Sequence, residues 1–228
     1  MHTNNIIIPD NLSQDNVLAF FTNRYIQKQI TPIVKEMGYG HFKVFMPSQR
    51  HTSDVYLLNG SIDKNVVADS VITIRKNVFI GIAIADCVPI LLYDTINQAI
   101  GAVHAGWRGT AGGILKNTLS MMEHSFKTQP ENIHMAIGPC IHKCCYQVGH
   151  EVVDKVTEST GQGQYVDKTD RGLYIDLKEA NRLQAEACGV TNIWVLERCT
   201  FCNNTEFFSY RRERKNAGRQ AGFIGLIN

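Results

Sequence analysis

The sequence predicts one α+β domain over residues 1–228, with a mixed, largely antiparallel sheet covered by helices. The 228 residues suffice to bury a large core, and no internal repeat or Pro/Ser-rich linker divides them. Between residues 42 and 105 the chain is rich in Val and Ile and is punctuated by turn residues, as in consecutive strands. Segments with helical periodicity lie on both sides of this stretch.

The first element is a helix expected over residues 14–38, with a break near Pro32 and an end at Gly38 or Gly40. The strands that follow are expected at "FKVFMP", "SDVYLL", "SVITIR", "VFIGIAIA", "PILLYD" and "AIGAVH". Several of these runs are apolar at consecutive positions, which indicates a sheet covered on both faces.

The second half alternates helices with strands. Thr110 is expected to cap a helix with an apolar stripe at Leu115, Leu119, Met122 and Phe126. A strand at "IHMAIG" and a helix at "HEVVDKVTEST" follow.

The last predicted helix is "LKEANRLQAEAC". Asp176 and Glu179 predict a capping box at its start, and Gly189 predicts its end. A strand at "NIWVLE" precedes a tail that is expected to be loop-rich and basic.

Composition excludes several classes of protein. Hydrophobic residues make up 44% and charged residues 19%, and the formal net charge is +2, so we expect neither a nucleic-acid-binding nor a membrane-surface protein. The longest apolar stretch is too short to span a membrane and contains Asp86 and Pro89. The first residues lack the pattern of a signal peptide, so we expect a cytoplasmic protein. Seven cysteines, an odd number, favour reduced thiols, metal ligands or nucleophiles over a disulfide framework.

A predicted hairpin brings two chemically active side chains together. If "DTINQA" is a tight turn, Asp94 pairs with Ala99, and the same register places His104 opposite Pro89. Cys87 then lies two residues further along the same face, with its Cβ roughly 7 to 8 Å from that of His104. The thiol and the imidazole can therefore approach one atom, whereas a slip of one residue would place them on opposite faces.

Cysteine and histidine are typical zinc ligands, and a catalytic zinc ion has three protein ligands and one open position. Asp86 either orients a histidine of such a site or binds the backbone at the end of its strand. The candidates for a third ligand, by residue type alone, are His41, His51, His134, His142, Cys140, Cys144, Cys145, Cys199 and Cys202. Their spacing does not choose among them.

Four segments carry a resemblance to a known family. They are "ADCVPILLYD" (85–94), "GAVHAGWRGT" (101–110), "IGPCIHKCCYQVG" (137–149) and "SYRRERKNAGR" (209–219). In this order they resemble the YfiH-like family, also called the laccase-domain or polyphenol oxidoreductase family, whose members are described as purine nucleoside phosphorylases. The resemblance extends from about residue 42 to the end of the chain.

The resemblance implies one zinc ion bound by His51, Cys87 and His104, which would be the catalytic residues. Gln49 belongs to the same Gln-x-His motif and is expected to bind substrate. The implied activities are phosphorolysis of adenosine, inosine and methylthioadenosine, together with deamination of adenosine. Zinc is expected rather than copper, because the eight histidines are scattered and form no paired HxH motif.

Phosphorolysis requires an anion site beside the metal. "GWRGT" is expected to lead into the N-terminus of a helix, where Arg108 can bind phosphate. Trp107 either stacks on a purine or packs in the core. The partners expected are therefore a nucleoside and phosphate, and the oligomeric state stays open. The arginines of the tail are expected to form a solvated face with at most one functional member, namely Arg211, Arg212, Arg214 and Arg219.

The chain departs from the family pattern at three places. A helix is expected where members have a Gly-rich loop after a Phe-Thr-x-Arg segment, Thr52 replaces the usual Gly, and Gln147 replaces a common Glu. The sequence therefore leaves the nucleoside specificity and the proton-handling group unassigned.

Other functions fit the same residues. Cys87 as a nucleophile with His104 as its base would make a metal-free hydrolase or amidase. A copper-dependent polyphenol oxidase and an enzyme that edits peptidoglycan precursors are further alternatives suggested by names used within the family. A second metal site is not expected, because adjacent Cys144 and Cys145 point to different sides of an extended chain, and "CTFC" (199–202) lacks a second CxxC or a His pair.

Overall fold

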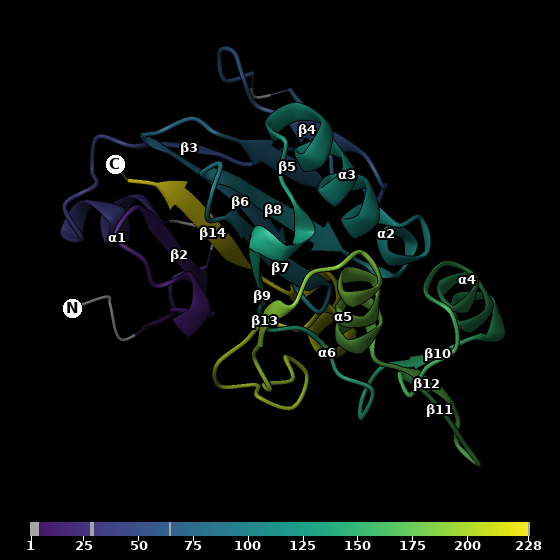
Figure 1. The fold of residues 1–228 in the computed structure, drawn as a ribbon. Coiled ribbons are helices and arrows are strands. Elements are labelled where there is room, and N and C mark those ends of the chain that lie inside the picture. Colours follow the sequence, from purple (N-terminus) through teal and green to yellow (C-terminus); the bar gives the residue numbers. More distant parts are fainter. Residues whose placement is uncertain (1–4, 28–29, 64, 228) are drawn as a thin grey trace.

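The computed structural model describes residues 5–27, 30–63 and 65–227. Within these residues two large sheets pack against each other, and helices lie on the outside of the pair (Figure 1). The α+β class and the mixed, largely antiparallel pairing predicted from the sequence are confirmed.

The first large sheet has six strands and contains the predicted hairpin. Across the sheet they are β13 (Asn192–Val195), β9 (Ile133–Ile137), β7 (Val88–Asp94), β8 (Ala99–Ala105), β5 (Ser70–Thr73) and β4 (Val55–Leu57). Each corresponds to a Val/Ile-rich run. The register of β7 with β8 is also the predicted one, since Asp94 pairs with Ala99 and Pro89 with His104.

The second large sheet has five strands, and two of them correct the predictions. Its strands are β1 (Ile6–Ile7), β2 (Val17–Thr22), β14 (Gln220–Leu226), β6 (Val78–Ile84) and β3 (Lys43–Phe45). The helix predicted over 14–38 is wrong, because β2 lies in its first half and, among the described residues of that range, only α1 (Thr31–Glu36) is α-helical. A strand buried on both faces is apolar throughout, so periodicity does not distinguish it from a helix.

The tail was predicted to be loop-rich, yet β14 lies at the centre of the five-stranded sheet. Glycines in these strands make room for aromatic rings on the neighbouring strand. A Cβ on Gly81 would lie 2.3 Å from the ring of Phe223, which pairs with it, and a Cβ on Gly225 would lie 2.7 Å from the ring of Phe79. The glycines of "QAGFIGL" therefore serve close packing within a strand rather than turns.

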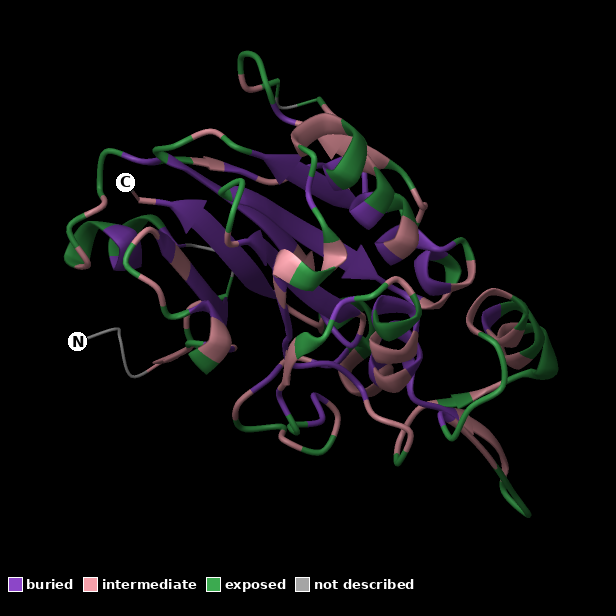
Figure 2. Ribbon diagram, in the orientation of Figure 1, coloured by how far each residue is buried: buried purple, intermediate pink, exposed green. Residues whose placement is uncertain are grey.

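Alternate side chains of β7 point to opposite faces of the six-stranded sheet and show what covers each face. Ile90 and Leu92 join the core under the helices, whereas Leu91 and Tyr93 join the core between the two sheets. The six-stranded sheet is thus covered by helices on one face only, and by the second sheet on the other. Figure 2 shows these central strands as buried.

Helices cover the outer face of the six-stranded sheet and the edge beside it. They are α2 (Trp107–Ala111), α3 (Ile114–Phe126), α4 (His150–Thr160) and α5 (Leu177–Ala187), whose apolar residues join one core with that sheet. The short α6 (Tyr210–Glu213) has no buried residue. Thr110 was predicted to cap α3, but it lies within α2. Gly113, with φ of +69°, directly precedes α3 instead. Asp176 caps α5 by accepting from the Glu179 N–H at 3.2 Å, but the Glu179 carboxylate pairs with Arg182 instead of completing the box.

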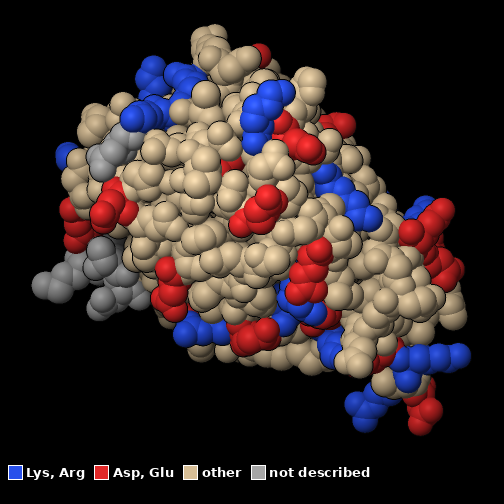
Figure 3. Space-filling model, viewed as in Figure 1, with Lys and Arg blue, Asp and Glu red and all other residues tan. Residues whose placement is uncertain are grey.

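A small third sheet projects from the body of the protein (Figure 1). It contains β10 (Gln147–Val148), β12 (Gly172–Ile175) and β11 (Val166–Thr169), none of which was predicted. In the described part of the chain, every helix is too short or too polar to cross a membrane. Lys and Arg are interspersed with Asp and Glu on the face shown in Figure 3.

Candidate active site

The fold gathers the three proposed ligands at one end of the hairpin. Cys87 directly precedes β7, His104 lies near the end of β8, and His51 lies in the loop between β3 and β4. Their donor atoms all lie within 4.8 Å of one another. The predicted register thus brings the thiol and the imidazole of residues 87 and 104 together, and the loop adds a second imidazole.

The carboxylate of Asp69 contacts both His104 and the loop that carries His51. Its carboxylate lies 2.7 Å from His104 Nδ1, which leaves Nε2 as the ring nitrogen available to a ligand. The same carboxylate accepts the backbone N–H groups of Arg50, His51 and Thr52 at 2.7 to 3.1 Å, and the Thr52 hydroxyl at 2.9 Å. It thereby fixes the loop in which His51 has a left-handed φ of +60°. Sequence reasoning did not identify this aspartate.

Cys87, His104 and Asp69 shift one another's pKa values. Burial raises the pKa of the Cys87 thiol, but the charges and hydrogen bonds of His104 and His51 outweigh it and lower that pKa to about 6. Burial lowers the pKa of His104, but Cys87 and Asp69 outweigh it and raise that pKa to about 9. Hydrogen bonds from His104 and the loop likewise overcome burial and hold the pKa of Asp69 well below its usual range. At neutral pH the metal-free pair is therefore a thiolate beside an imidazolium.

The space around the donors fits a zinc ion. A Cβ on Gly106 would lie 3.0 Å from Cys87 Sγ and 3.1 Å from Cδ2 of His51, so a side chain there would crowd two of the three donor residues. Two imidazoles and a thiolate form a three-ligand set of the kind that catalytic zinc sites use, with one position left open. The glycine after the strand thus serves to keep the centre free.

The cluster opens into a cavity of about 730 Å³. Asp86 is the one acidic residue among the described residues that line it. Basic and aromatic side chains dominate the rest of its polar wall, namely Arg108, Arg211, Arg214, Arg219, Trp107, Tyr146 and Tyr210. Such a wall suits a ligand with an anionic group and a planar ring.

Asp86, with φ of +86°, binds neither histidine. Its carboxylate accepts from the hydroxyls of Thr200 and Ser209 at 2.6 and 3.0 Å and from the Arg211 N–H at 2.6 Å. Of the two roles left open by the sequence, the structure therefore shows the one in which Asp86 binds its surroundings, here the segment that carries Arg211 into the cavity wall. The histidine-orienting role belongs to Asp69.

The two residues expected to bind substrate both line the cavity. The Gln49 carboxamide donates to the Ala83 carbonyl and accepts from the Ala83 N–H, each at 2.8 Å, so it is anchored to β6. Arg108 projects from α2, with its guanidinium carbon 4.2 Å from the centroid of the Trp107 ring.

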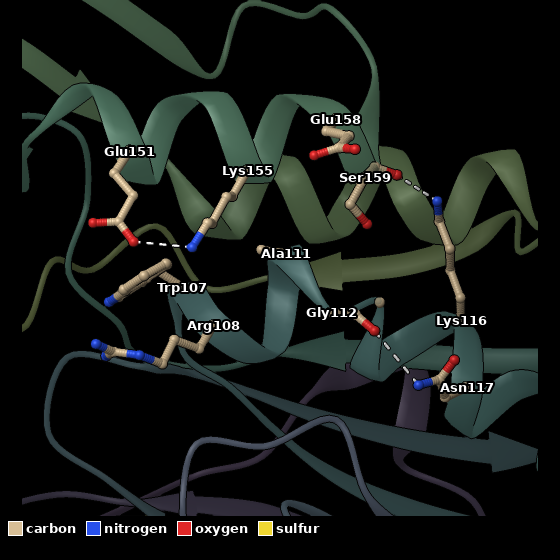
Figure 4. Close-up of a pocket in the computed structure, with 11 residues that line it drawn as sticks. Trp107, Arg108, Ala111, Gly112, Lys116, Asn117, Glu151, Lys155, Glu158 and Ser159 are labelled. Atoms are coloured by element: carbon tan, nitrogen blue, oxygen red, sulfur yellow. Dashed lines mark hydrogen bonds and ion pairs between the residues drawn. The ribbon is translucent and has the colours of Figure 1, made fainter.

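Arg108 and Trp107 also line a neighbouring cavity of about 770 Å³, between α2 and α4 (Figure 4). On the far side of that cavity Lys155 pairs with Glu151 at 2.9 Å. Arg108 therefore stands at the boundary between two hollows and can contact a ligand from either side.

The tail arginines are only in part the solvated face that we expected, because Arg214 is exposed but three of the four line the cavity. Arg211 donates to the Gln147 carbonyl at 2.9 Å and lies 5.1 Å from the centroid of the Tyr146 ring, while Arg214 and Arg219 also line the cavity. Arg212 turns away and donates to backbone carbonyls of the preceding segment.

Residues 22–227 match the family described as multi-copper polyphenol oxidoreductase laccase. The chain belongs to this family. It is 41% identical over 170 residues to a protein of Geobacillus stearothermophilus named purine nucleoside phosphorylase YlmD, covering 69% of this chain and 59% of that protein. A purine nucleoside phosphorylase of Clostridium acetobutylicum is 37% identical over 194 residues, 84% of this chain and 77% of the relative.

Solved structures of the laccase family share the fold. The crystal structure of YlmD from Geobacillus stearothermophilus superposes with a TM-score of 0.86 at 30% identity, covering 96% of this chain and 94% of that one. That of YfiH from Bacillus licheniformis gives a TM-score of 0.83 at 29% identity over 92% of both chains. The family resemblance seen in the sequence is thus confirmed.

Proposed function

We propose that this chain is a zinc-dependent purine nucleoside phosphorylase, acting on adenosine, inosine and methylthioadenosine, that also deaminates adenosine. One observation carries the proposal: two imidazoles and a thiolate lie together in the wall of a cavity lined by arginines and aromatic rings. The names of the relatives, purine nucleoside phosphorylases, support it.

His51, Cys87 and His104 would hold the zinc ion. When bound, zinc supplies a Lewis acid that activates water near neutral pH, which suits the deamination step. Asp69 keeps His104 in the tautomer that presents Nε2, and Gly106 leaves the donors uncrowded. His₂Cys is also a donor set of blue copper sites, but those add a weak axial ligand that is usually methionine, and no methionine is among the described residues lining the cavity.

The phosphate would bind to Arg108 and the neighbouring arginines of the wall. This replaces the helix N-terminus as the expected anion site, because α2 is only five residues long. Trp107 and Tyr146 offer ring faces for the purine. The anionic and planar parts of the substrate pair would then lie beside the donors.

The proposal is tested by incubating the purified chain with adenosine, with and without phosphate. We expect adenine and ribose 1-phosphate only when phosphate is present, and inosine in both cases. Release of adenine at the same rate without phosphate would exclude phosphorolysis. Absence of any conversion when adenosine, inosine and methylthioadenosine are each supplied in turn would exclude the proposed function.

A metal-free cysteine hydrolase is the second candidate, because the pKa of Cys87 is lowered to about 6 beside His104. Metal removal separates the two. A hydrolase would keep its activity in metal-stripped protein and lose it on alkylation of Cys87, whereas the zinc enzyme would lose activity with the metal.

A further inference from the structure

A second cluster of thiols lies outside the candidate active site. Among the described residues, the sulfur atoms of Cys144, Cys145, Cys199 and Cys202 all lie within 4.8 Å of one another. Cys202 Sγ is 3.3 Å from Cys145 Sγ and 3.8 Å from Cys144 Sγ. A tetrahedral zinc ion with Zn–S bonds of about 2.3 Å separates its sulfurs by about 3.8 Å. The four thiols are therefore arranged at nearly the spacing that one ion requires.

Two turns create this arrangement. The N–H groups of Cys145 and Tyr146 both donate to the His142 carbonyl at 3.0 Å, so the chain around Cys144 is coiled rather than extended. This removes the objection raised from the sequence, that adjacent cysteines point to different sides. The CxxC segment closes a second turn, in which the Asn203 N–H donates to the Cys199 carbonyl at 3.0 Å.

A backbone donor points at one of these four sulfurs. The His142 N–H donates to Cys199 Sγ at 3.4 Å, a contact that stabilises a metal-bound sulfur.

We propose that Cys144, Cys145, Cys199 and Cys202 bind a second, structural zinc ion. As the four S–Zn bonds form, the thiol protons pass to solvent, and no oxidant or reductant is needed. All four positions around the ion are filled by sulfur, which is the pattern of a structural rather than a catalytic site.

The ion would cross-link two segments that build the wall of the active-site cavity. Tyr146 follows directly after the cysteine pair, and Arg211 follows the CxxC turn; both line the cavity. The segments already meet, since Thr200 N–H donates to the Cys140 carbonyl at 2.9 Å and Arg211 donates to the Gln147 carbonyl. The metal therefore positions the wall without touching substrate.

The test is the metal content of the full-length chain, expressed with zinc supplementation, purified under reducing conditions and analysed by native mass spectrometry. We expect two zinc ions per wild-type chain, one in Cys202→Ser and two in Cys188→Ser, a matched control for loss of a thiol elsewhere. Cobalt loaded into Cys87→Ser should give the intense visible absorption of a tetrahedral tetrathiolate, and adding Cys202→Ser should abolish it.

Three outcomes would overturn the proposal. They are two zinc ions retained in Cys202→Ser, no thiolate absorption in cobalt-loaded Cys87→Ser, and a disulfide among the four cysteines in wild-type protein that holds no metal there. The wild-type count and the cobalt spectrum of Cys87→Ser do not depend on Cys202→Ser folding. The cobalt spectrum of Cys87→Ser is also independent of the proposed function, because this variant lacks a ligand of the catalytic site yet keeps the four cysteines of the second site.

Discussion

Two clusters of possible metal ligands in this protein contain similar donor atoms in different surroundings. In the first, Cys87 is joined by two imidazoles, anchored by a buried carboxylate and opened to a cavity by a glycine. In the second, four cysteines from two turns approach one point, and none is among the described residues lining that cavity. Three zinc ligands beside a cavity leave one position where a substrate can react. Four sulfur ligands fill every position around the ion, which suits an ion that only cross-links the chain. The open position, rather than the presence of cysteine, distinguishes the two.

Removal of one donor from each cluster gives the largest expected contrast. Cys87→Ala should lower kcat/KM for adenosine phosphorolysis by more than about 100-fold, since loss of even an outer partner of a metal ligand typically costs 10- to 100-fold. Steady-state kinetics and metal content measure the effect. Cys202→Ser should lose much less activity, because it disturbs the position of the cavity wall without removing a ligand of the catalytic centre. If Cys87→Ala stays active, the first cluster is not the catalytic centre.

Asp69→Asn tests how much of the first cluster depends on its carboxylate. We expect zinc affinity and activity to fall roughly 10- to 100-fold, because the variant loses the negative charge beside His104. Competition with a chromophoric chelator measures the affinity. Asp94→Asn is the matched control: Asp94 is equally buried but lies at the other end of the hairpin, where it accepts from the N–H groups of Ile96 and Asn97. Equal losses of zinc affinity in both variants would show general destabilisation instead.

The contrast between Asp69 and the pair Cys87 and His104 also shows which parts of the site the sequence alone predicts. Cys87 and His104 were predicted to approach each other because they belong to one hairpin, in which a tight turn fixes every pairing. Asp69 precedes β5, whose Ser70 pairs with Val103 of β8. Its approach to His104 depends on which strands are neighbours in the sheet, and no local pattern reveals that order. The acidic residue before a Val/Ile-rich strand was the available signal.

The strands of the fold divide in the same way, into those that a local sequence pattern predicts and those that it does not. Strands with clear turns at their ends, such as β7 and β8, were correct, whereas β2 and β14 were missed because burial on both faces removes alternation and glycines resemble loop residues. His51 was identified through the family resemblance alone. The four-cysteine cluster was missed because its geometry arises from two turns that meet only in the folded chain.

Arg108→Ala probes the cavity wall beside the open cluster. Loss of one charge-assisted hydrogen bond, about 1.5 to 3 kcal/mol when well formed, should raise KM for phosphate roughly tenfold, because Arg108 is exposed and the bond is weakened by water. KM for nucleoside should change much less. Arg171→Ala, on the projecting small sheet, serves as the control for loss of a positive charge. Equal increases in both KM values would place Arg108 outside the phosphate site.

Thiol reactivity in metal-stripped protein offers a smaller contrast between the clusters. The alkylation rate of Cys87 should rise with pH through about 6 and then level off, because the thiolate is the nucleophile and His104 lowers that pKa. Cys144, with a pKa raised to about 11, should still be gaining reactivity at high pH. At pH 7 Cys87 should react roughly 30- to 90-fold faster, after allowance for the lower nucleophilicity of a low-pKa thiolate. Tandem mass spectrometry of alkylated peptides measures both; a midpoint for Cys87 near its ordinary value would contradict the thiolate–imidazolium pair.

The smallest expected effect comes from the hydroxyl that stands where family members usually have glycine. Thr52 donates to Asp69 at 2.9 Å, beside the three backbone N–H groups that bind the same carboxylate. Thr52→Val keeps the shape of the side chain and removes two hydrogen bonds, the one to Asp69 and one from the Asp54 N–H at 3.2 Å, so it should destabilise the fold by about 1 to 2 kcal/mol and lower Tm by roughly 2 to 8 °C. Thr52→Ser keeps the hydroxyl and should lie closer to wild type in thermal unfolding. Zinc affinity should change only slightly, because the backbone groups still hold the carboxylate against His104; a loss as large as that of Asp69→Asn would mean that the hydroxyl, not the backbone, orients the open cluster.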